Sequence, residues 1–153
     1  MDHKLKLMVV DDSPLFRTWL IRSLSADDRF QVVGYAVNAL DAQEKIPLLQ
    51  PDMLTLDIEM PGMSGIDFLK QLLPVHPIPV ILVSSLNLRV FDALEAGAVD
   101  FVRKPDEANG LSKEIFLSML RSKLMVAAAS HVHLPSAPAD PQAGGIRKVS
   151  SLP

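Results

Sequence analysis

The sequence of 153 residues contains no cysteine. This absence excludes disulfide bonds, thiolate metal sites and cysteine nucleophiles from the chain. Basic residues do not dominate either, because 15 Lys and Arg face 18 Asp and Glu, and the net charge is −3. A domain that binds nucleic acid through phosphate neutralisation needs clustered Lys and Arg. We therefore expect no nucleic-acid partner.

Long hydrophobic runs are also absent. No apolar stretch approaches the roughly 20 residues that cross a bilayer, and the apolar part of residues 1–12 is too short for a secretory signal. We expect no membrane insertion and a cytoplasmic location. The remaining composition, 48% hydrophobic and 22% charged, is that of a globular protein long enough for one domain with a sizeable core.

Five short apolar runs are spaced along the first two thirds of the chain. Four of them are rich in Val, Ile or Leu without polar alternation, which is typical of strands covered on both faces in a parallel sheet. The five predicted strands are residues 5–10, 31–37, 52–56, 79–84 and 99–102.

Segments of helical period separate these runs. The first is expected to begin at Pro14 with Ser13 as its N-cap. Three more occupy residues 38–49, 65–73 and 89–97, where Pro47 should end or bend the helix and Gly97 should follow its helix as the C′ residue. A fifth helix is predicted from about residue 111 to 129. The side chains expected to face the sheet are Leu15, Phe16, Trp19, Leu20 and Leu24 in the first helix, and Ile115, Phe116, Met119, Leu120 and Leu124 in the last.

The alternation of strands and helices predicts an α/β fold, a doubly wound (βα)₅ three-layer sandwich with a parallel sheet and right-handed crossovers. Residues 1–129 would form this domain. Residues 130–153 are rich in Pro, Ala and Ser, and we interpret them as a linker or disordered tail. Ligands of such sheets bind beyond the carboxyl ends of the strands.

Polar residues follow four of the predicted strands, so they should gather at one edge of the sheet. Two or three carboxylates there would repel one another, and a divalent cation or an ammonium group would offset the repulsion. Oxygen ligands without sulfur favour Mg²⁺ or Mn²⁺ over zinc. The residues are Asp11 and Asp12 after the first strand, Asp57 after the third, Ser84 and Ser85 at the fourth, and Lys104 after the fifth.

Each of these residues taken singly also has a structural interpretation. Asp11 or Asp12 would suit the start of the first helix, Ser85 the start of the fourth, Asp57 a turn, and Lys104 a solvated surface position. Their joint placement favours a site. A carboxylate beside a cation, a hydroxyl and a lysine is typical of phosphoryl transfer, with the carboxylate attacking phosphorus.

The motifs "VVDDS", "LTLDIEMPGMSG", "VS" and "KP", in this order, resemble the signature of the response-regulator receiver domain of two-component signalling, over about residues 5–125. The resemblance implies a flavodoxin-like fold with a parallel sheet of order 2-1-3-4-5 and a cis Lys104–Pro105 bond. It also implies a histidine kinase, or its phosphotransfer domain, as phosphoryl donor. It implies that Asp57 is the phospho-acceptor and that Lys104 pairs with the phosphoryl oxygens. The implied Mg²⁺ ligands are Asp12 directly, Asp11 through a water molecule, and Glu59 through its backbone carbonyl. Ser84 would be the switch hydroxyl and Phe101 the aromatic switch residue.

Three longer stretches, "DMLTLDIEMPGMSGIDFL", "IPVILVSSL" and "EAGAVDFVRKP", are most similar to the receiver of chemotaxis protein-glutamate methylesterases. The resemblance implies that the chain regulates an effector domain or another protein target through its fourth helix, fifth strand and fifth helix. This chain has no Gly-x-Ser-x-Gly elbow, so we expect no ester hydrolysis by it. It departs from the family at Ser64, where Asp is common, and in a short segment between Ser84 and Gly97.

Other hypotheses stay open at this point. The chain could be a stand-alone receiver or serve a different output domain. An aspartyl-phosphate phosphatase of the haloacid-dehalogenase type also uses an Asp after a strand, but the second acid would be Glu59 and the expected Asp-x-Asp pattern is absent. A receiver-like domain that only binds partners is disfavoured by the complete set of acids and by Lys104.

Overall fold

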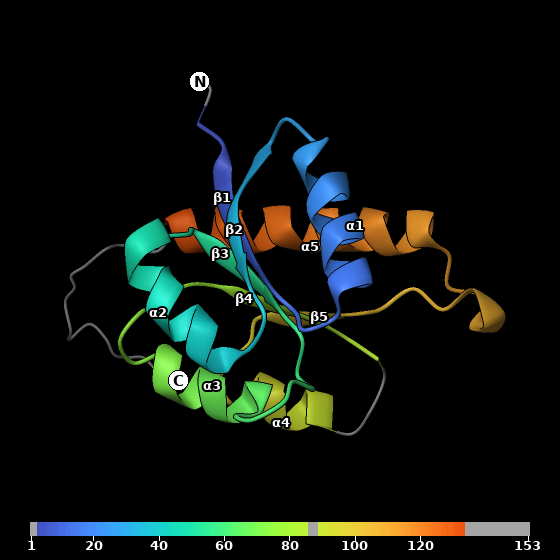
Figure 1. The fold of residues 1–153 in the computed structure, drawn as a ribbon. Helices are drawn as coiled ribbons and strands as arrows, with labels where there is room; N and C mark the ends of the chain where they lie inside the picture. Colours follow the sequence, from blue (N-terminus) through green and yellow to red (C-terminus); the bar gives the residue numbers. More distant parts are fainter. Residues whose placement is uncertain (1–2, 86–88, 134–153) are drawn as a thin grey trace, which may run out of the picture.

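One five-stranded parallel sheet organises the molecule, in the order β2-β1-β3-β4-β5 (Figure 1). We describe it from a computed structural model that covers residues 3–85 and 89–133, with side chains to Ser130. The predicted strand order is confirmed. The strands are β1 Leu5–Val10, β2 Phe30–Ala36, β3 Met53–Leu56, β4 Val80–Ser84 and β5 Asp100–Arg103.

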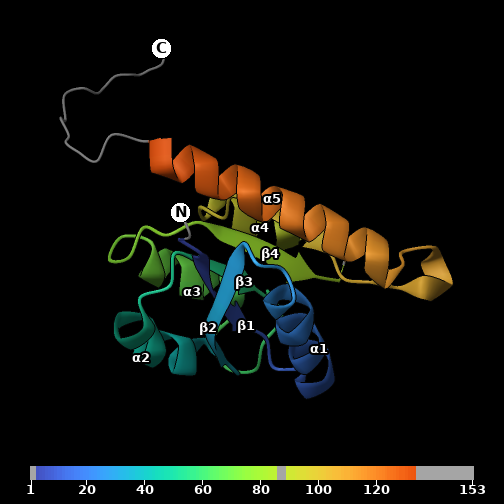
Figure 2. The same cartoon turned by 90° about the horizontal axis from the view of Figure 1, so that it is seen from above.

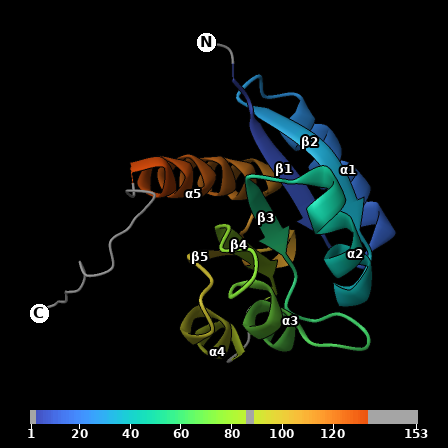
Figure 3. The ribbon, with the colours of Figure 1, turned by 90° about the vertical axis from the view of Figure 1, so that its left-hand side faces the viewer.

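Helices cover both faces of the sheet and give the predicted three layers (Figures 2 and 3). Helices α1 and α5 share one hydrophobic core with the sheet, and α2, α3 and α4 share the other. A 3₁₀ turn at Glu107–Asn109 precedes the last helix. The α-helices are α1 Pro14–Ser25, α2 Ala39–Leu49, α3 Gly65–Leu72, α4 Arg89–Glu95 and α5 Lys113–His133.

The central strands are apolar because both of their faces are covered. Every residue of β3 and β4 is buried. In β3, Leu54 and Leu56 belong to the core under α2, α3 and α4, whereas Met53 belongs to the core under α1 and α5. Such alternation leaves no polar face, which explains the unbroken apolar runs in the sequence.

Three side chains that were expected to face the sheet are exposed instead. Leu15 is 87% exposed, Ile115 50% and Met119 45%. The helical period gives the direction of an apolar face but not its width, and α1 and α5 share one face of a narrow sheet. The buried row of α5 is Phe116, Leu120 and Leu124.

The helix termini follow the expectation except in detail. Ser13 is the N-cap of α1, as predicted, although its side chain makes no capping bond. Helix α2 contains Pro47 and continues to Leu49, so the proline does not end the helix at the preceding residue. Gly97 does follow α4 with a φ of +119°, the left-handed conformation that glycine adopts readily.

Helix α5 begins at Lys113 and ends at His133. The first four residues of the predicted tail, 130–133, are therefore helical, and residues 134–153 lie outside the described part of the chain. Among the residues that the structure describes, no helix is both long and apolar enough to cross a membrane.

Candidate functional site

The carboxyl ends of the parallel strands bring the predicted site residues together. The Asp57 N–H donates to the Val10 carbonyl at 3.0 Å, and the Lys104 N–H donates to the Ser84 carbonyl at 3.0 Å. These bonds continue the ladders β1·β3 and β4·β5 by one residue past the strands. The point where the strand order reverses lies beside β1 and β3, which is where doubly wound sheets bind ligands.

Three carboxylates meet at this edge. Asp11, Asp12 and Asp57 each bring one oxygen to within 4.8 Å of the others. Asp11 and Asp57 are buried, with exposures of 2% and 6%, and Asp12 is exposed. A group of oxygen ligands with one side open to solvent fits a hard divalent cation.

Backbone donors orient the two buried carboxylates. Oδ1 of Asp11 accepts from the Ser13 N–H at 2.8 Å, so Asp11 also supports the start of α1. Oδ1 of Asp57 accepts from the Glu59 N–H at 3.1 Å. Asp11 thus supports the start of a helix and Asp57 supports a turn, as their structural interpretations predict, but each does so with only one of its two carboxylate oxygens.

The second oxygens of both carboxylates contact Lys104. Its Nζ lies 3.0 Å from Oδ2 of Asp11 and 3.3 Å from Oδ2 of Asp57. Lys104 is therefore not a solvated surface lysine. All described peptide bonds are trans, so the cis Lys104–Pro105 bond implied by the resemblance is wrong for this structure, which has the form that X-Pro bonds generally prefer.

The environment shifts the pKa values of Asp57 and Lys104 upward. Burial is the main cause that raises the pKa of Asp57, and the charge of Asp11 adds to it, whereas Lys104 acts in the opposite direction. For Lys104, burial alone would lower the pKa, but Asp11 and Asp57 more than offset this effect. Lys104 thus only partly offsets the effect of burial and of the Asp11 charge on Asp57.

Ser84 presents a buried hydroxyl at the same edge. Its side chain is fully buried, and Oγ has no hydrogen-bond partner among the described residues. A buried hydroxyl without a partner is rare and costly. It does not cap α4, and it is available to a group that arrives at the site.

The remaining predicted residues lie nearby, with different degrees of support. Phe101 is half-buried on β5 and packs against the core under α2, α3 and α4. The side chain of Glu59 is exposed, and its N–H holds Asp57 as described. The ligand role of the Glu59 carbonyl stays a prediction.

Sequence reasoning missed two residues of α1 that contact the site. Nη1 of Arg17 donates to the Asp11 carbonyl at 2.9 Å. The ring of Phe16 lies beneath the Lys104 ammonium, 4.6 Å from the ring centroid to Nζ. Phe16 and Arg17 follow the "DDS" motif by about one helical turn, and this spacing was the only feature of the sequence that could have placed them near the site.

The loop after Asp57 depends on a close contact with α3. A Cβ on Gly65 would lie 2.8 Å from the Cα of Ile58, so a larger residue would displace the segment that follows Asp57. Ser64, the departure from the family pattern, is the N-cap of α3, and its Oγ accepts from the Asp67 N–H at 3.2 Å. The hydroxyl thus supplies the capping function that an Asp would supply.

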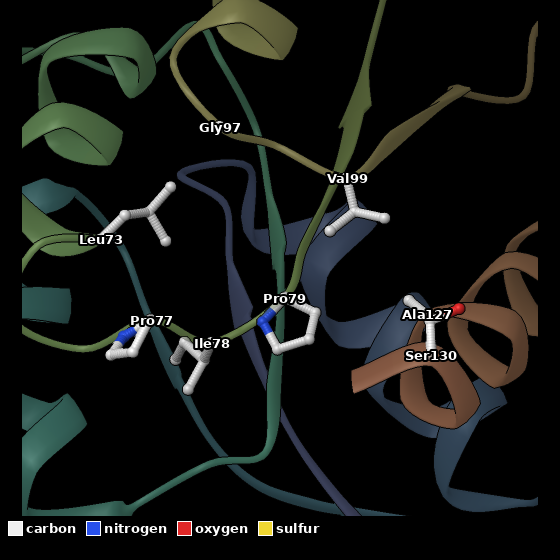
Figure 4. A pocket seen from close by; sticks show the side chains of 8 residues that line it. All are labelled: Leu73, Pro77, Ile78, Pro79, Gly97, Val99, Ala127 and Ser130. Atoms are coloured by element: carbon white, nitrogen blue, oxygen red, sulfur yellow. The ribbon is translucent and has the colours of Figure 1, made fainter. Parts of the chain in front are cut away.

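An apolar pocket lies away from this site. It opens at the amino ends of β4 and β5, between the end of α3 and the last turns of α5, and Pro79 and Val99 line it (Figure 4). None of the lining residues is one of the acids, Ser84 or Lys104. The candidate site therefore lies at the opposite end of the sheet from this pocket.

Comparison with known proteins agrees with this arrangement. Residues 7–116 match the response regulator receiver domain family. The chain is 46% identical over 130 residues to a protein-glutamate methylesterase/protein-glutamine glutaminase of Syntrophomonas wolfei, and 43% identical over 136 residues to one of Vibrio vulnificus. These alignments cover 85% and 86% of this chain but only 38% and 39% of the relatives, so the chain spans about two fifths of their length.

Solved structures give the same result. The response regulator domain of Thermotoga maritima CheB has a TM-score of 0.73 and 36% identity, over 83% of this chain and 98% of that one. A chain from the complex of the P1 domain of CheA3 with CheY6 of R. sphaeroides has a TM-score of 0.67 and 28% identity, over 82% and 97%. The match over most of the folded part, together with the acids at the sheet edge, shows that this chain belongs to the response regulator receiver domain family.

Proposed function

We propose that the chain is a phosphorylation-controlled receiver in which Asp57 accepts a phosphoryl group. The observation that carries the proposal is the contact of Lys104 with both Asp11 and Asp57, beside the unpartnered hydroxyl of Ser84. Asp57 is fixed through one oxygen, and the other faces the positive charge that a phosphoryl group requires.

The acids fit Mg²⁺, or Mn²⁺ in its place. Asp12 and Asp57 would hold the ion directly, Asp11 through a water molecule and Glu59 through its backbone carbonyl. When bound, the ion supplies charge neutralisation at the phosphoryl oxygens. Support comes from the convergence of three carboxylate oxygens, which are the ligands that such ions prefer.

The transfer step forms a bond from an Asp57 oxygen to phosphorus. If a phosphohistidine is the donor, its P–N bond breaks, and the histidine leaves with the electron pair and takes up a proton. Lys104 would pair with a phosphoryl oxygen, and the Ser84 hydroxyl would donate to another. The hydrogen bond from the Glu59 N–H already orients the Asp57 carboxylate, which lowers the entropic cost of positioning the nucleophile.

A histidine kinase, or its phosphotransfer domain, is the proposed donor. The similar chain from the complex between the P1 domain of CheA3 and CheY6 supports this class of partner. We assign the chain to the cytoplasm, where such a kinase would present its phosphohistidine.

The switch would pass from Ser84 to Phe101 and on to the surface of α4, β5 and α5. When Ser84 moves toward the phosphoryl group, Phe101 follows into the space, and the population shifts toward the active surface. Apolar side chains exposed on this surface support a role in binding a protein. They include Phe91 at 65%, Ile115 at 50% and Met119 at 45% exposure.

We propose a chemotaxis protein-glutamate methylesterase as the parent protein. The two relatives with 46% and 43% identity support it. A stand-alone receiver, or one with another output domain, is the alternative. The native reading frame beyond Pro153 decides between them, since a hydrolase domain there would establish the first.

Phosphoryl uptake tests the main proposal. The chain is incubated with Mg²⁺ and an acyl phosphate, and intact mass is measured. We expect one added phosphoryl group in the wild type and in Asp28→Asn, a surface control, and none in Asp57→Asn. Uptake by Asp57→Asn would refute the assignment. Absence of uptake by the wild type, with turnover of a simple phosphomonoester, would favour the phosphatase alternative.

A further inference from the structure

The Phe16 ring is the third contact of the Lys104 ammonium. Besides the two carboxylate oxygens at 3.0 and 3.3 Å, Nζ lies 4.6 Å from the centre of this ring. A cation at this distance over an aromatic face is attracted by the ring quadrupole. Lys104 is thus held by two charged groups from β1 and β3 and by one uncharged group from α1.

Other rings fix the place of Phe16. Its centroid lies 5.7 Å from that of Trp19 and 5.8 Å from that of Phe116, and Trp19 and Phe116 are 5.9 Å apart. The cluster joins α1 to α5, and both helices pack on the same core. The ring beneath Lys104 is therefore set by helix packing rather than by the strand-end loops.

The carboxylate contacts of Lys104 are the ones that the proposed chemistry disturbs. Oδ1 of Asp11 and Oδ1 of Asp57 already accept backbone N–H groups, so Lys104 contacts the Oδ2 atoms. A cation bound to these acids, and a phosphoryl group on Asp57, both compete for those oxygens. The contact between the ring and Lys104 meets no such competition, because an uncharged phenyl ring is a ligand of neither the metal ion nor the phosphoryl group.

We propose that Phe16 is a positioning residue that keeps the Lys104 ammonium at the sheet edge while its carboxylate partners are taken over. Without the ring, the flexible lysine chain would sample positions in solvent and would have to be ordered again when the phosphoryl group binds. This inference deepens the proposed function and rests on it. Phe16 acts through Lys104 and touches no reacting atom.

The test uses beryllofluoride with Mg²⁺ as a phosphoryl mimic, titrated against the amide signals of Asp57 and Ser84. We expect Phe16→Leu to bind it about fivefold more weakly than the wild type, the loss that a partly desolvated cation–π contact predicts. Phe16→Tyr keeps the ring and should restore affinity to within about twofold. The affinity for Mg²⁺ alone should change by less than about twofold, since the ring contacts none of the acids.

A second readout does not depend on phosphoryl chemistry. The ring current of Phe16 should shift the ε-methylene protons of Lys104 upfield in the wild type and in Phe16→Tyr, and this shift should be lost in Phe16→Leu. It detects the contact itself. If Phe16→Leu folds poorly, Phe16→Met, which keeps the volume without the aromatic face, gives the same comparison.

Phe30→Leu is the matched control, because it removes a buried ring of the same core that is not among the rings packed on Phe16. It should unfold more easily but bind beryllofluoride within about twofold of the wild type. An equal loss of beryllofluoride affinity in Phe30→Leu and Phe16→Leu would mean that Phe16 acts only through core packing and would overturn the inference, as would wild-type affinity in Phe16→Leu. If the wild type fails to bind the mimic, the proposed function fails, and the inference fails with it even where the ring-current shift is present.

Discussion

Two groups of charges lie at opposite ends of the sheet and differ in their balance. At the carboxyl ends, Asp11 and Asp57 share the single ammonium of Lys104. At the amino end of β2, Asp27 has two guanidinium partners. Its Oδ2 lies 2.7 Å from Nη2 of Arg29 and 3.5 Å from Nε of Arg121.

The pKa values of the two acids move in opposite directions. Burial raises the pKa of Asp57, whereas the hydrogen bonds from Arg29 lower the pKa of Asp27 to about 2. The second group pairs one carboxylate with two guanidinium groups and joins the α1–β2 loop to α5. The first pairs two buried carboxylates with one ammonium, which leaves a net negative charge that a bound cation would offset. An uncompensated group is therefore the better mark of a functional site.

The largest expected effect comes from Lys104→Met. Without the ammonium, two buried carboxylates face each other, and the free energy of unfolding at pH 7 should fall by roughly 3 kcal/mol. Added Mg²⁺ should recover part of the loss because it replaces the missing charge. Urea unfolding with and without Mg²⁺ measures both effects. An unchanged midpoint of the urea transition in Lys104→Met would contradict the view that Lys104 offsets the charges of the two carboxylates.

Asp57→Asn should act in the opposite direction and raise the free energy of unfolding by about 1 kcal/mol, because it removes a buried charge. Since the pKa of Asp57 is raised on folding, the ionised carboxylate costs stability above its folded pKa. This cost disappears as the pH falls toward the unfolded value. Thermal unfolding of both proteins between neutral and acidic pH should therefore converge, and a constant difference would count against this explanation.

Asp27→Asn should lower the free energy of unfolding by up to about 1 kcal/mol at pH 7, which is the upper end of the range for exposed ion pairs. The pKa of Asp27 falls from 3.8 to about 2 on folding. The carboxylate therefore contributes its full stabilisation of the fold above about pH 4, and this stabilisation is lost as the pH falls to about 2. The neighbouring Asp28→Asn is the control. Equal effects of the two changes at pH 7 would remove the distinction between the two groups.

Ser84→Ala should have the smallest effect on stability, within about 0.5 kcal/mol, because the hydroxyl has no partner to lose. It should nevertheless weaken the binding of beryllofluoride with Mg²⁺. Chemical unfolding and the amide titration separate the two quantities. A large loss of stability would reveal a structural role for this hydroxyl.

The sequence predicted the composition of the site for a topological reason. When every crossover is a strand followed by a helix, all strands point the same way, and the residues after them must meet at one edge. Asp11, Asp57, Ser84 and Lys104 could therefore be grouped without coordinates. Their local patterns also predicted the strand bounds to within one residue.

The residues that sequence reasoning missed depend on packing between distant elements. The contact of Phe16 with Lys104 joins the start of α1 to the segment that follows β5, and no local pattern encodes it. The pairing of Asp27 with Arg121 likewise joins the α1–β2 loop to α5. The exposure of Leu15 was missed for a related reason, because a period does not tell how much of a helix its neighbours cover.

The length of α5 gives the molecule a mechanical property. The helix has 21 residues, which at about 1.5 Å per residue make a rod of roughly 30 Å that follows the sheet and extends past it (Figure 2). A tilt of about 5° at Phe116 would displace the backbone of His133 by roughly 2 Å. Because the buried row of α5 continues from Phe116 to Ala128, such a tilt would have to move this whole row against the sheet, and the displacement would be largest at the carboxyl end of the helix.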